Sequence, residues 1–391
     1  MNPKINSYTE FQPLKTLLVG GVYEDSFFND IKNDTIREGL KEIISSTRED
    51  IDNLKEELIN RDINVLQYTP KDLGFKDSIM DYMDDEGVIG KNTDLSRDGY
   101  RNGIPIPPIS VRDDCIVMGQ KLLVTDPTPY PTQLAIPKYK KLFGAENVDT
   151  RIEDESISFK RTEKNARKWC IKHGINPEDV DIDQIIEDRL LTQFCAPNLT
   201  RVGKTILVDV WQTPELVEKY LQPYWPEYDY KEIWIGGHND SIYCVVRPGL
   251  VLATPWFEPY KDIFKGWDII WFEDPDWDKT MSKQHKLKEN NMGKYWYPEK
   301  KDNPELEYFI NEWLSTWHGD ASESVFDVNI LMLDENTAVI NSESPALIKE
   351  LEKRKIEPIV IPLRNRFFWD GGWHCNTLDI YREGDMEDYG L

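Results

Sequence analysis

The sequence predicts an α/β fold of one domain over residues 1–391, built from repeated units of two strands, a helix and a further strand. Three observations support this prediction. Pairs of short apolar runs recur with turn residues between them, helical patterns follow several of these pairs, and an apolar strand pattern follows a helix. Repetition of such ββαβ-like units favours a radial arrangement around a shared axis.

Four segments carry the hairpin pattern of two apolar runs around a tight turn. They are residues 114–124, 198–208, 241–252 and 328–340. Each turn contains Gly, Pro, Asp or Asn, which are residues that favour tight turns. A further apolar run at 14–20 would form part of an additional unit.

Two segments have the apolar spacing of an amphipathic helix. Residues 36–59 place six Leu and Ile side chains at helical intervals. Residues 344–355 begin with Ser344 as a plausible N-cap and Pro345 at the first helical position. The second helix leads into an apolar strand at 358–363, which completes the predicted unit.

Two stretches interrupt the repeating pattern. Residues 149–188 are charged and mostly helical in character, whereas residues 274–317 are rich in Trp, Lys and Asp and have little periodicity. We interpret both as insertions over one face of the domain, where lids and contacts between subunits tend to lie. A homo-oligomer is therefore one arrangement that the sequence allows.

The chain is strongly acidic, with 71 Asp and Glu residues against 47 Lys and Arg residues and a formal net charge of −24. Nucleic acids and anionic membranes both reward an excess of Lys and Arg, so the composition argues against either as a partner. A cationic small molecule is compatible with this charge.

Five cysteines are dispersed along the chain without the spacing of a zinc site or a disulfide framework. They are Cys115, Cys170, Cys195, Cys244 and Cys375. We interpret them as free thiols in a reducing cytosol. The first six residues lack the apolar region of a signal peptide, and no segment is long enough to span a bilayer. We therefore expect a soluble cytoplasmic protein.

The segment 371–375, Gly-Gly-Trp-His-Cys, presents a lone cysteine after two glycines. Glycines allow a sharp turn or a close approach to a ligand, so Cys375 is a candidate nucleophile at the mouth of a pocket. The alternative is a buried cysteine in a terminal strand. If this segment is a strand, His374 faces away from Cys375, and we then assign His374 a structural role.

A second constellation, Gly236-Gly237-His238-Asn239-Asp240, supplies a base and a carboxylate. A nucleophilic cysteine needs a base or a cation to favour its thiolate. A lone histidine is often a core residue. The position of His238 between Gly237 and Asp240, in a chain with only five histidines, favours a catalytic role instead.

Five motifs in order along nearly the whole chain resemble those of the guanidino-group-modifying enzymes, and among them most closely the amidinotransferases. This is the group of glycine amidinotransferase and the aminocyclitol amidinotransferases. The motifs are Ile5-Asn6-Ser7-Tyr8-Thr9-Glu10-Phe11-Gln12-Pro13-Leu14, Arg112-Asp113 before an apolar strand, His238-Asn239-Asp240 before Pro248-Gly249, Asn329-Ile330-Leu331-Met332-Leu333-Asp334-Glu335, and Gly371 to Thr377.

The resemblance implies a five-bladed α/β-propeller, in agreement with the repeat. It also implies a ping-pong transfer of an amidino group, usually from arginine to an acceptor amine, without metal or organic cofactor. The expected partners are therefore a guanidino donor and an amine, both small molecules.

The resemblance also assigns roles to particular residues. Cys375 attacks the guanidinium carbon and carries the amidino group, while His238 protonates the leaving amine and later deprotonates the incoming one. Asp113 and Asp240 hold the guanidinium nitrogens, which offsets the cost of removing a cation from water. Without the resemblance, Asp113 would be interpreted as a carboxylate at a turn or strand end.

Residues 194–198 depart from the family pattern. The family has a carboxylate that orients the catalytic histidine, and this chain has Cys195 in its place. Loss of the equivalent charge in a Ser-His-Asp triad costs about 10⁴ in rate. Either another acid, Asp114 or Asp209, replaces it, or the activity is weak or altered. We include Asn198, at the end of this motif, and Arg112 among the expected substrate-binding residues.

A second departure concerns the donor. Glycine amidinotransferase has an arginine shortly after a proline to bind the donor's α-carboxylate, whereas residues 253–258 here read Ala-Thr-Pro-Trp-Phe-Glu. The donor then lacks a free carboxylate, or Arg364 or Arg366 binds it instead.

Two other functions remain open from the sequence. One is a hydrolase of the same superfamily, such as a deiminase or dihydrolase, in which water resolves the covalent intermediate. The other is a catalytically silent binding protein on the same scaffold, which the change at Cys195 would allow. Retention of Cys375, His238, Asp240 and Asp113 together argues against the silent scaffold.

Overall fold

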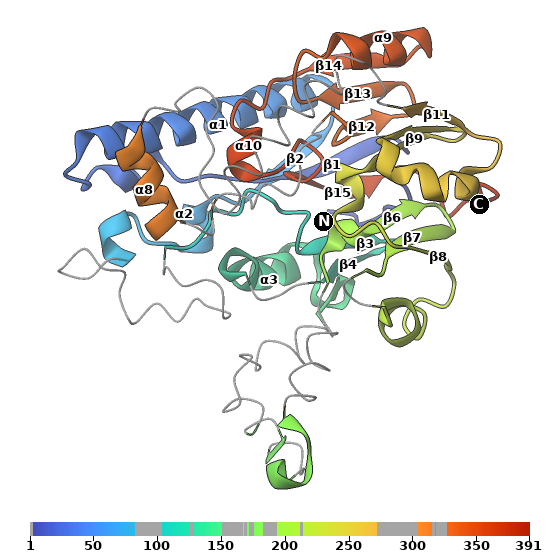
Figure 1. Ribbon diagram of the computed structural model, residues 1–391, viewed down its shortest axis with the longest axis horizontal. Helices are drawn as coiled ribbons and strands as arrows, with labels where there is room; N and C mark the ends of the chain where they lie inside the picture. Colours follow the sequence, from blue (N-terminus) through green and yellow to red (C-terminus); the bar gives the residue numbers. More distant parts are fainter. Residues whose placement is uncertain are drawn as a thin grey trace.

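Five mixed sheets of three strands each form the β structure of the part of the chain that the structure describes (Figure 1). The structure is a computed structural model, and it describes residues 3–82, 104–125, 129–150, 167, 170–171, 176–182, 194–211, 214–271, 303–314, 317 and 327–391. In each sheet a leading strand pairs antiparallel with a central strand, and the central strand pairs parallel with a third. The predicted α/β class is confirmed.

The sheets are β15-β1-β2, β3-β4-β5, β6-β7-β8, β9-β10-β11 and β12-β13-β14. Their strands are β1 (Leu14–Val19), β2 (Asn64–Gln67), β3 (Cys115–Met118), β4 (Lys121–Val124), β5 (Val148–Asp149), β6 (Leu199–Val202), β7 (Thr205–Asp209), β8 (Asp229–Ile233), β9 (Tyr243–Arg247), β10 (Leu250–Ala253), β11 (Asp268–Trp271), β12 (Leu331–Asp334), β13 (Thr337–Ile340), β14 (Glu357–Val360) and β15 (Thr377–Arg382). The four predicted hairpins are all present, as β3–β4, β6–β7, β9–β10 and β12–β13.

The two ends of the chain share one sheet. The apolar run predicted at 14–20 forms β1, and its antiparallel partner is β15, at the other end of the sequence. Leu17 lies opposite Asp379, and Val19 lies opposite Thr377. β15 is therefore the leading strand of the sheet that contains β1 and β2.

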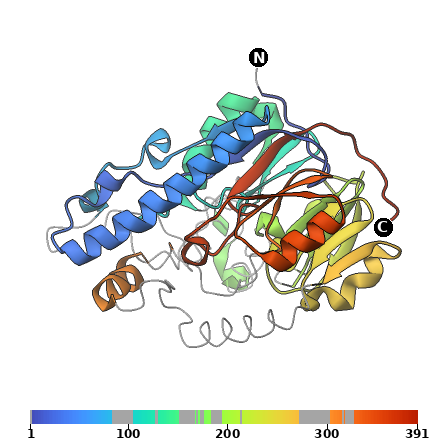
Figure 2. The same cartoon turned by 90° about the horizontal axis from the view of Figure 1, so that it is seen from above.

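Helices lie around these sheets (Figures 1 and 2). They are α1 (Asp34–Asn60), α2 (Pro70–Leu73), α3 (Tyr130–Phe143), α8 (Pro304–Trp313), α9 (Pro345–Lys353) and α10 (Arg366–Trp369). Helix α8 packs against α1. The side chain of Asn33 caps α1 by accepting hydrogen bonds from the amides of Thr35 and Ile36. The helix predicted at 344–355 is α9, with Pro345 at its start, but the side chain of Ser344 makes no capping bond.

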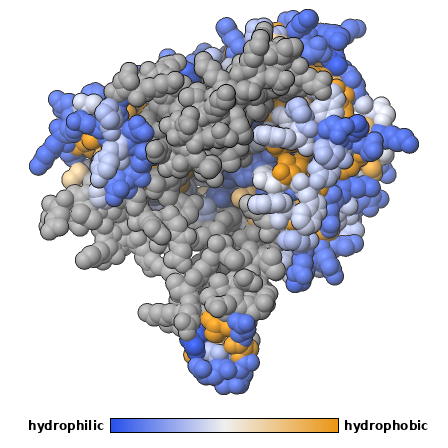
Figure 3. Space-filling view, viewed as in Figure 1, coloured by the Kyte–Doolittle hydropathy of each residue, from blue (hydrophilic) through white to orange (hydrophobic). Residues whose placement is uncertain are grey.

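Most of the two predicted insertions, 149–188 and 274–317, lies outside the described residues. Within the described ranges, no helix is both long enough and apolar enough to cross a membrane. In Figure 3, most of the described surface that is visible is hydrophilic, with some hydrophobic patches.

A fully buried carboxylate, Asp379 of β15, accepts hydrogen bonds from three buried arginines. Arg112 Nη2 lies 2.7 Å from Asp379 Oδ1, Arg201 Nη2 lies 2.8 Å from Oδ2, and Arg382 Nε lies 3.1 Å from Oδ2. Ser7 Oγ also donates a hydrogen bond to Asp379 Oδ2 at 2.6 Å. We call Asp379 and these three arginines the arginine hub.

The arginine hub links four of the five sheets. Arg201 belongs to β6 and donates to the carbonyl of Val117 in β3, while Arg382 of β15 donates to the carbonyl of Met332 in β12. Arg112 donates through Nε to the carbonyl of Thr377, where β15 begins. Charged groups are buried without large penalty only when they are paired and hydrogen-bonded, which this arrangement achieves.

We predict that Asp379→Asn lowers the free energy of unfolding by about 3 to 5 kcal/mol, because it leaves three buried cations without their anion. Burial acts to raise the pKa of Asp379, but the charges of Arg201, Arg112 and Arg382 outweigh it and hold the pKa well below its usual range. A lowered pKa stabilises the fold above about pH 4 and loses that effect as the pH falls toward the folded value. The difference between the proteins should therefore shrink in acid.

Urea unfolding followed by circular dichroism between pH 3 and pH 7 measures both effects. The control is Glu383→Gln, which removes an exposed partner of Lys15 and should cost less than about 1 kcal/mol. Equal stability of Asp379→Asn and the wild type at pH 7 would show that the hub does not hold the sheets together.

Candidate functional site

The candidate catalytic residues lie at one end of the five sheets, just before the leading strands. Asp113 precedes β3, Asn198 precedes β6, Asp240 precedes β9 and Cys375 precedes β15. Asn329, for which the sequence predicts no separate role, holds the same place before β12. The repeat therefore brings one polar or nucleophilic side chain from each sheet to the same end of the molecule.

Hydrogen bonds join these five loops in a closed ring. The amide of Arg112 donates to the carbonyl of Cys375 at 3.2 Å, and the amide of Ala196 donates to the carbonyl of Asp113 at 2.9 Å. The remaining three links come from Asn side chains: Asn239 Nδ2 to Asn198 O at 3.0 Å, Asn329 Nδ2 to Asp240 O at 3.3 Å, and Cys375 N to Asn329 Oδ1 at 3.1 Å. The ring fixes the spacing of the candidate residues.

Cys375 sits in a turn that occupies residues 373–376, immediately before β15. Its Sγ is 3.2 Å from Asp240 Oδ2 and 2.9 Å from Asn329 Nδ2, and the residue is buried. A thiol here donates to the carboxylate, and a thiolate accepts from the amide. The turn thus brings the sulfur between an acceptor and a donor.

The Asp240 carboxylate contacts both His374 and Cys375. Its Oδ2 lies 2.7 Å from His374 Nδ1 and also contacts Cys375 Sγ, whereas its buried Oδ1 has no hydrogen-bond partner within the described residues. Burial opposes ionisation, but the hydrogen bond and charge of His374 outweigh it and, with the charge of His238, lower the pKa of Asp240 to about 2. An ionised, incompletely satisfied carboxylate is suited to bind a cation.

The assumption that His374 lies in a strand, and therefore faces away from Cys375, is wrong. Neighbouring side chains alternate only in a strand, and residues 373–376 form a turn. His374 therefore reaches the same carboxylate as Cys375, and its Nε2 lies 3.6 Å from Glu10 Oε2. Glu10 belongs to the N-terminal motif, and the sequence gave no sign that it would lie against the histidine.

His238 is half-buried and follows a loop that Asp209 organises. Asp209, at the end of β7, accepts from the amide of Ile235 at 2.9 Å and from the amides of Gly236 and Gly237 at 3.2 Å. Gly236 has a φ of +83°, a left-handed conformation that favours glycine. Of the two acids considered as replacements for the family carboxylate, Asp209 therefore shapes the loop that carries His238.

The other acid, Asp114, points elsewhere: its Oδ2 accepts a hydrogen bond from Thr132 in α3. Cys195 is half-buried and directly precedes the residue whose amide binds the Asp113 carbonyl. Arg364, considered as a partner for the donor's carboxylate, is bound to α1 through Asp50 at 2.8 Å and Glu49 at 2.6 Å.

The remaining expected residues differ in exposure. Asp113 is half-buried and borders a cavity of about 100 Å³. Asn198 is buried, and its side chain donates to the carbonyl of Asp209 at 3.4 Å. Arg112 is buried in the arginine hub, and its Nε also donates to the carbonyl of His374 at 2.8 Å.

Within the described residues, no three His, Cys, Asp or Glu side chains gather as a metal site.

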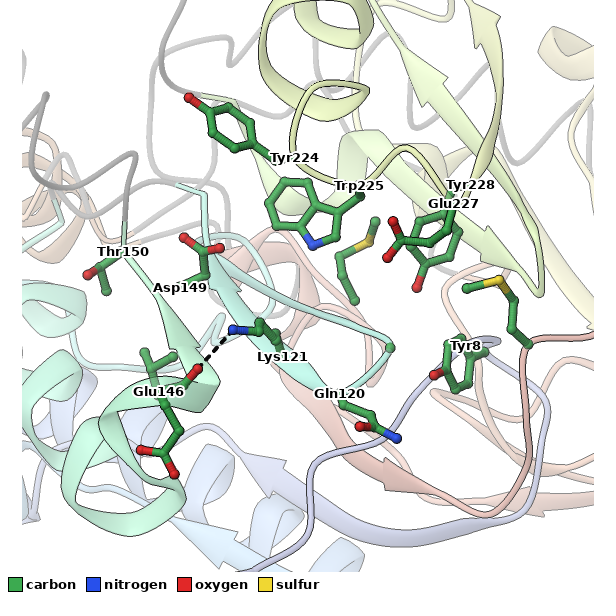
Figure 4. Close-up of a pocket in the computed structure, with 14 residues that line it drawn as sticks. Tyr8, Gln120, Lys121, Glu146, Asp149, Thr150, Tyr224, Trp225, Glu227 and Tyr228 are labelled. Carbon is green, nitrogen blue, oxygen red and sulfur yellow. Dashed lines mark hydrogen bonds between the residues drawn. The ribbon is translucent and has the colours of Figure 1, made fainter.

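A larger cavity of about 730 Å³ lies between the sheet of β3–β5 and the segment that leads into β8 (Figure 4). It is lined by aromatic side chains such as Tyr8 and Trp225 and by the carboxylates of Glu146 and Glu227. Its edge includes Gly119, at the turn of the β3–β4 hairpin, which is the opposite end of β3 from Asp113. This cavity is therefore distinct from the site around Cys375.

Comparison with known proteins relates the chain to several amidinotransferases, although no family model matches it. It is 27% identical over 261 residues to the L-arginine:L-lysine amidinotransferase of Pseudomonas savastanoi pv. phaseolicola, a match that covers 60% of this chain and 61% of that protein. It is 26% identical to the mitochondrial glycine amidinotransferase of Xenopus laevis over 50% of this chain and 40% of that protein.

The third relative is inosamine-phosphate amidinotransferase 1 of Streptomyces glaucescens, at 26% identity over 50% of this chain and 49% of that protein. The matches thus span 40 to 61% of these relatives.

Two solved structures share the fold over almost the full length of the chain. One is an amidinotransferase of the saxitoxin biosynthetic pathway from Microseira wollei, with a TM-score of 0.58 at 18% identity and coverage of 98% and 99%. The other is an inosamine-phosphate amidinotransferase from Streptomyces griseus, with a TM-score of 0.57 at 19% identity and 99% coverage of both chains.

We predict that Gly372→Ala destabilises the turn that carries Cys375. A Cβ at this position would lie 2.7 Å from Asn329 Oδ1 and 2.8 Å from Asn329 O, so the ring of loops must shift. Overpacking of this kind costs about 1 to 3 kcal/mol. The matched control is Gly237→Ala, where a Cβ meets nothing within 4 Å, and both free energies of unfolding can be measured in urea. Equal stability of the two variants would contradict the close packing at Gly372.

Proposed function

We propose that this chain, which is related to the amidinotransferases by sequence and shares their fold, transfers an amidino group from a guanidino donor to an acceptor amine. The observation that carries the proposal is the direct contact of Cys375 Sγ with the ionised Asp240 carboxylate at 3.2 Å. A guanidinium held by that carboxylate would place its carbon beside the sulfur.

In the first half-reaction, the thiolate of Cys375 forms a bond to the guanidinium carbon, and the bond from that carbon to the donor's substituted nitrogen breaks. The thiol proton passes through the base to the departing nitrogen, which leaves as a neutral amine. The amidino group remains on the sulfur as a cationic thioether. In the second half-reaction, an acceptor amine attacks the same carbon and the thiolate departs.

Asp240 is proposed to hold the donor cation through its unpartnered Oδ1. Asp113 stands in the loop of the ring next to that of Cys375 and is proposed as the second carboxylate. Two carboxylates would fix the guanidinium in plane and offset its loss of hydration. The depressed pKa of Asp240 keeps this group charged at neutral pH.

His238 is proposed to shuttle the proton between the sulfur, the leaving amine and the incoming amine. Asp209 supports it by bonding to the amides of the preceding loop rather than by occupying the family position, where Cys195 stands. Arg112 and Asn198 are proposed to act by holding the loops of the ring, since their hydrogen bonds run to His374 O and Asp209 O.

Arginine is the proposed donor, because the name of the Pseudomonas relative includes it. The three sequence relatives are named as transferases, which favours transfer to an amine over hydrolysis. The acceptor is an amine, and the retained contacts of Cys375 favour catalysis over a silent scaffold. All five cysteines are free thiols, which supports the proposed reducing, cytoplasmic location.

We also propose that the five sheets are the blades of an α/β-propeller around the arginine hub. Three observations support this arrangement: the equal strand order of the sheets, the pairing of β15 with β1, and the closed ring of hydrogen bonds between the leading loops. The site would then lie at one end of the propeller axis.

A ping-pong reaction predicts exchange between donor and product without any other acceptor. Incubated with arginine and isotopically labelled ornithine, the protein should move the label into arginine, because ornithine can attack the amidino group on Cys375. Chromatography of the two amino acids with scintillation counting measures the exchange rate. Cys375→Ala should reduce this rate to background.

The control is Cys244→Ala, which removes a buried thiol of β9 and should retain the exchange. Exchange that persists in Cys375→Ala, or its absence in the wild type, would contradict amidino transfer from arginine through Cys375.

A further inference from the structure

The side chain of Asn329 contacts Cys375 with both ends of its amide. Nδ2 lies 2.9 Å from Cys375 Sγ, and Oδ1 accepts a hydrogen bond from the Cys375 backbone amide at 3.1 Å. The residue is 1% exposed, so water does not compete for these groups.

The orientation of this amide follows from its neighbours. Oδ1 must face the Cys375 N–H, which can only donate, and Nδ2 must face the carbonyl of Asp240, which can only accept and lies 3.3 Å away. One N–H of Nδ2 therefore goes to Asp240 O, and the other is directed at Sγ. The donor on the sulfur is fixed by geometry and does not depend on the choice of rotamer.

Asn341 holds Asn329 and the turn in this arrangement. Its Nδ2 donates to Asn329 O at 2.9 Å, and its Oδ1 accepts from the amide of Trp373 at 2.6 Å. Gly372 packs so closely on the pair that a Cβ would clash with both asparagines. The N–H donor is thus preorganised before any substrate arrives.

We propose that Asn329 is a catalytic residue that stabilises the thiolate of Cys375 through its Nδ2–H. A hydrogen bond to a charged group contributes more than one to a neutral group, so the amide favours the thiolate over the thiol. The same donor stabilises the thiolate when it leaves the amidino carbon in the second half-reaction. That catalytic part rests on the proposed function, whereas the effect on thiol ionisation does not.

Several charged groups surround the sulfur and, like Asn329, affect the ionisation of the Cys375 thiol. Asp240 of the β9 loop opposes the thiolate, whereas His374 in the same turn and the buried guanidinium of Arg112 below it favour the thiolate when charged. Glu10 lies behind His374, and the charge of His238 acts on Asp240. The carboxylate at 3.2 Å disfavours the thiolate, and the Nδ2–H of Asn329 at 2.9 Å acts against that effect.

The test is the pH dependence of Cys375 alkylation by iodoacetamide, read as modified Cys375 peptide by mass spectrometry. Asn329→Asp keeps the shape and the Oδ1 acceptor but replaces the N–H donor with an anionic oxygen. We expect the midpoint of alkylation to rise by about one to two pH units, since a hydrogen bond to a charged group is worth about ten- to a hundredfold in an equilibrium. Turnover should fall by a similar factor, with little change in KM for the donor.

Asn341→Ala is the matched control, because it loosens the same turn without removing the donor on the sulfur. Its midpoint should stay within about 0.3 pH units of the wild type. If Asn329→Asp does not fold, Asn329→Ala decides the question, since it removes the donor without adding charge. An unchanged midpoint in the folded variant, or an equal rise in Asn341→Ala, would overturn the proposal. A raised midpoint without any arginine–ornithine exchange in the wild type would retain the role in ionisation and reject amidino transfer from arginine.

Discussion

The buried pairing of Asp379 with three arginines is the interaction on which the rest of the structure depends. One carboxylate faces three guanidinium groups, and none of them is accessible to water. Their remaining N–H groups reach main-chain carbonyls of different sheets, so the charges are compensated only when these sheets are correctly placed. Such a pairing adds little to stability when intact, but it strongly penalises arrangements that break it.

The hub also helps to hold the turn that carries Cys375. Arg112 extends from the hub and binds the carbonyls of His374 and Thr377, on both sides of Cys375. From the other side, the ring of leading loops binds the Cys375 main chain through Asn329 and through the Arg112 amide. The turn that carries the sulfur is therefore held by two sets of bonds, which meet at Arg112.

The charge of Asp240 has two opposing effects within the site. The lowered pKa of Asp240 provides a charged group for the proposed guanidino donor, but the same charge disfavours a thiolate at 3.2 Å. The N–H of Asn329 offsets that repulsion at the sulfur. An acidic chain with a net charge of −24 would draw cations to this site. The ionisation of Cys375, however, is set by buried charged groups, and salt screens these groups only weakly.

Periodicity and turn chemistry in the sequence were sufficient to predict the hairpins and the helices α1 and α9, since these are local properties. The pairing of β1 with β15 joins residues more than 350 positions apart, and no local pattern indicates it. The assumption of a strand at His374 was wrong, because residues 373–376 form a turn. Asn329 was missed, although its place before a leading strand, equivalent to that of Cys375, was a signal in the repeat itself.

The central claim is that Cys375 carries the amidino group, and the most direct test is mass spectrometry of the intact protein mixed with arginine in the absence of any acceptor amine. The account predicts one added amidino group that maps to the peptide containing Cys375 and is absent from Cys375→Ala. Consumption of arginine with Cys375 unmodified at every time point, or the same adduct on Cys375→Ala, would contradict it.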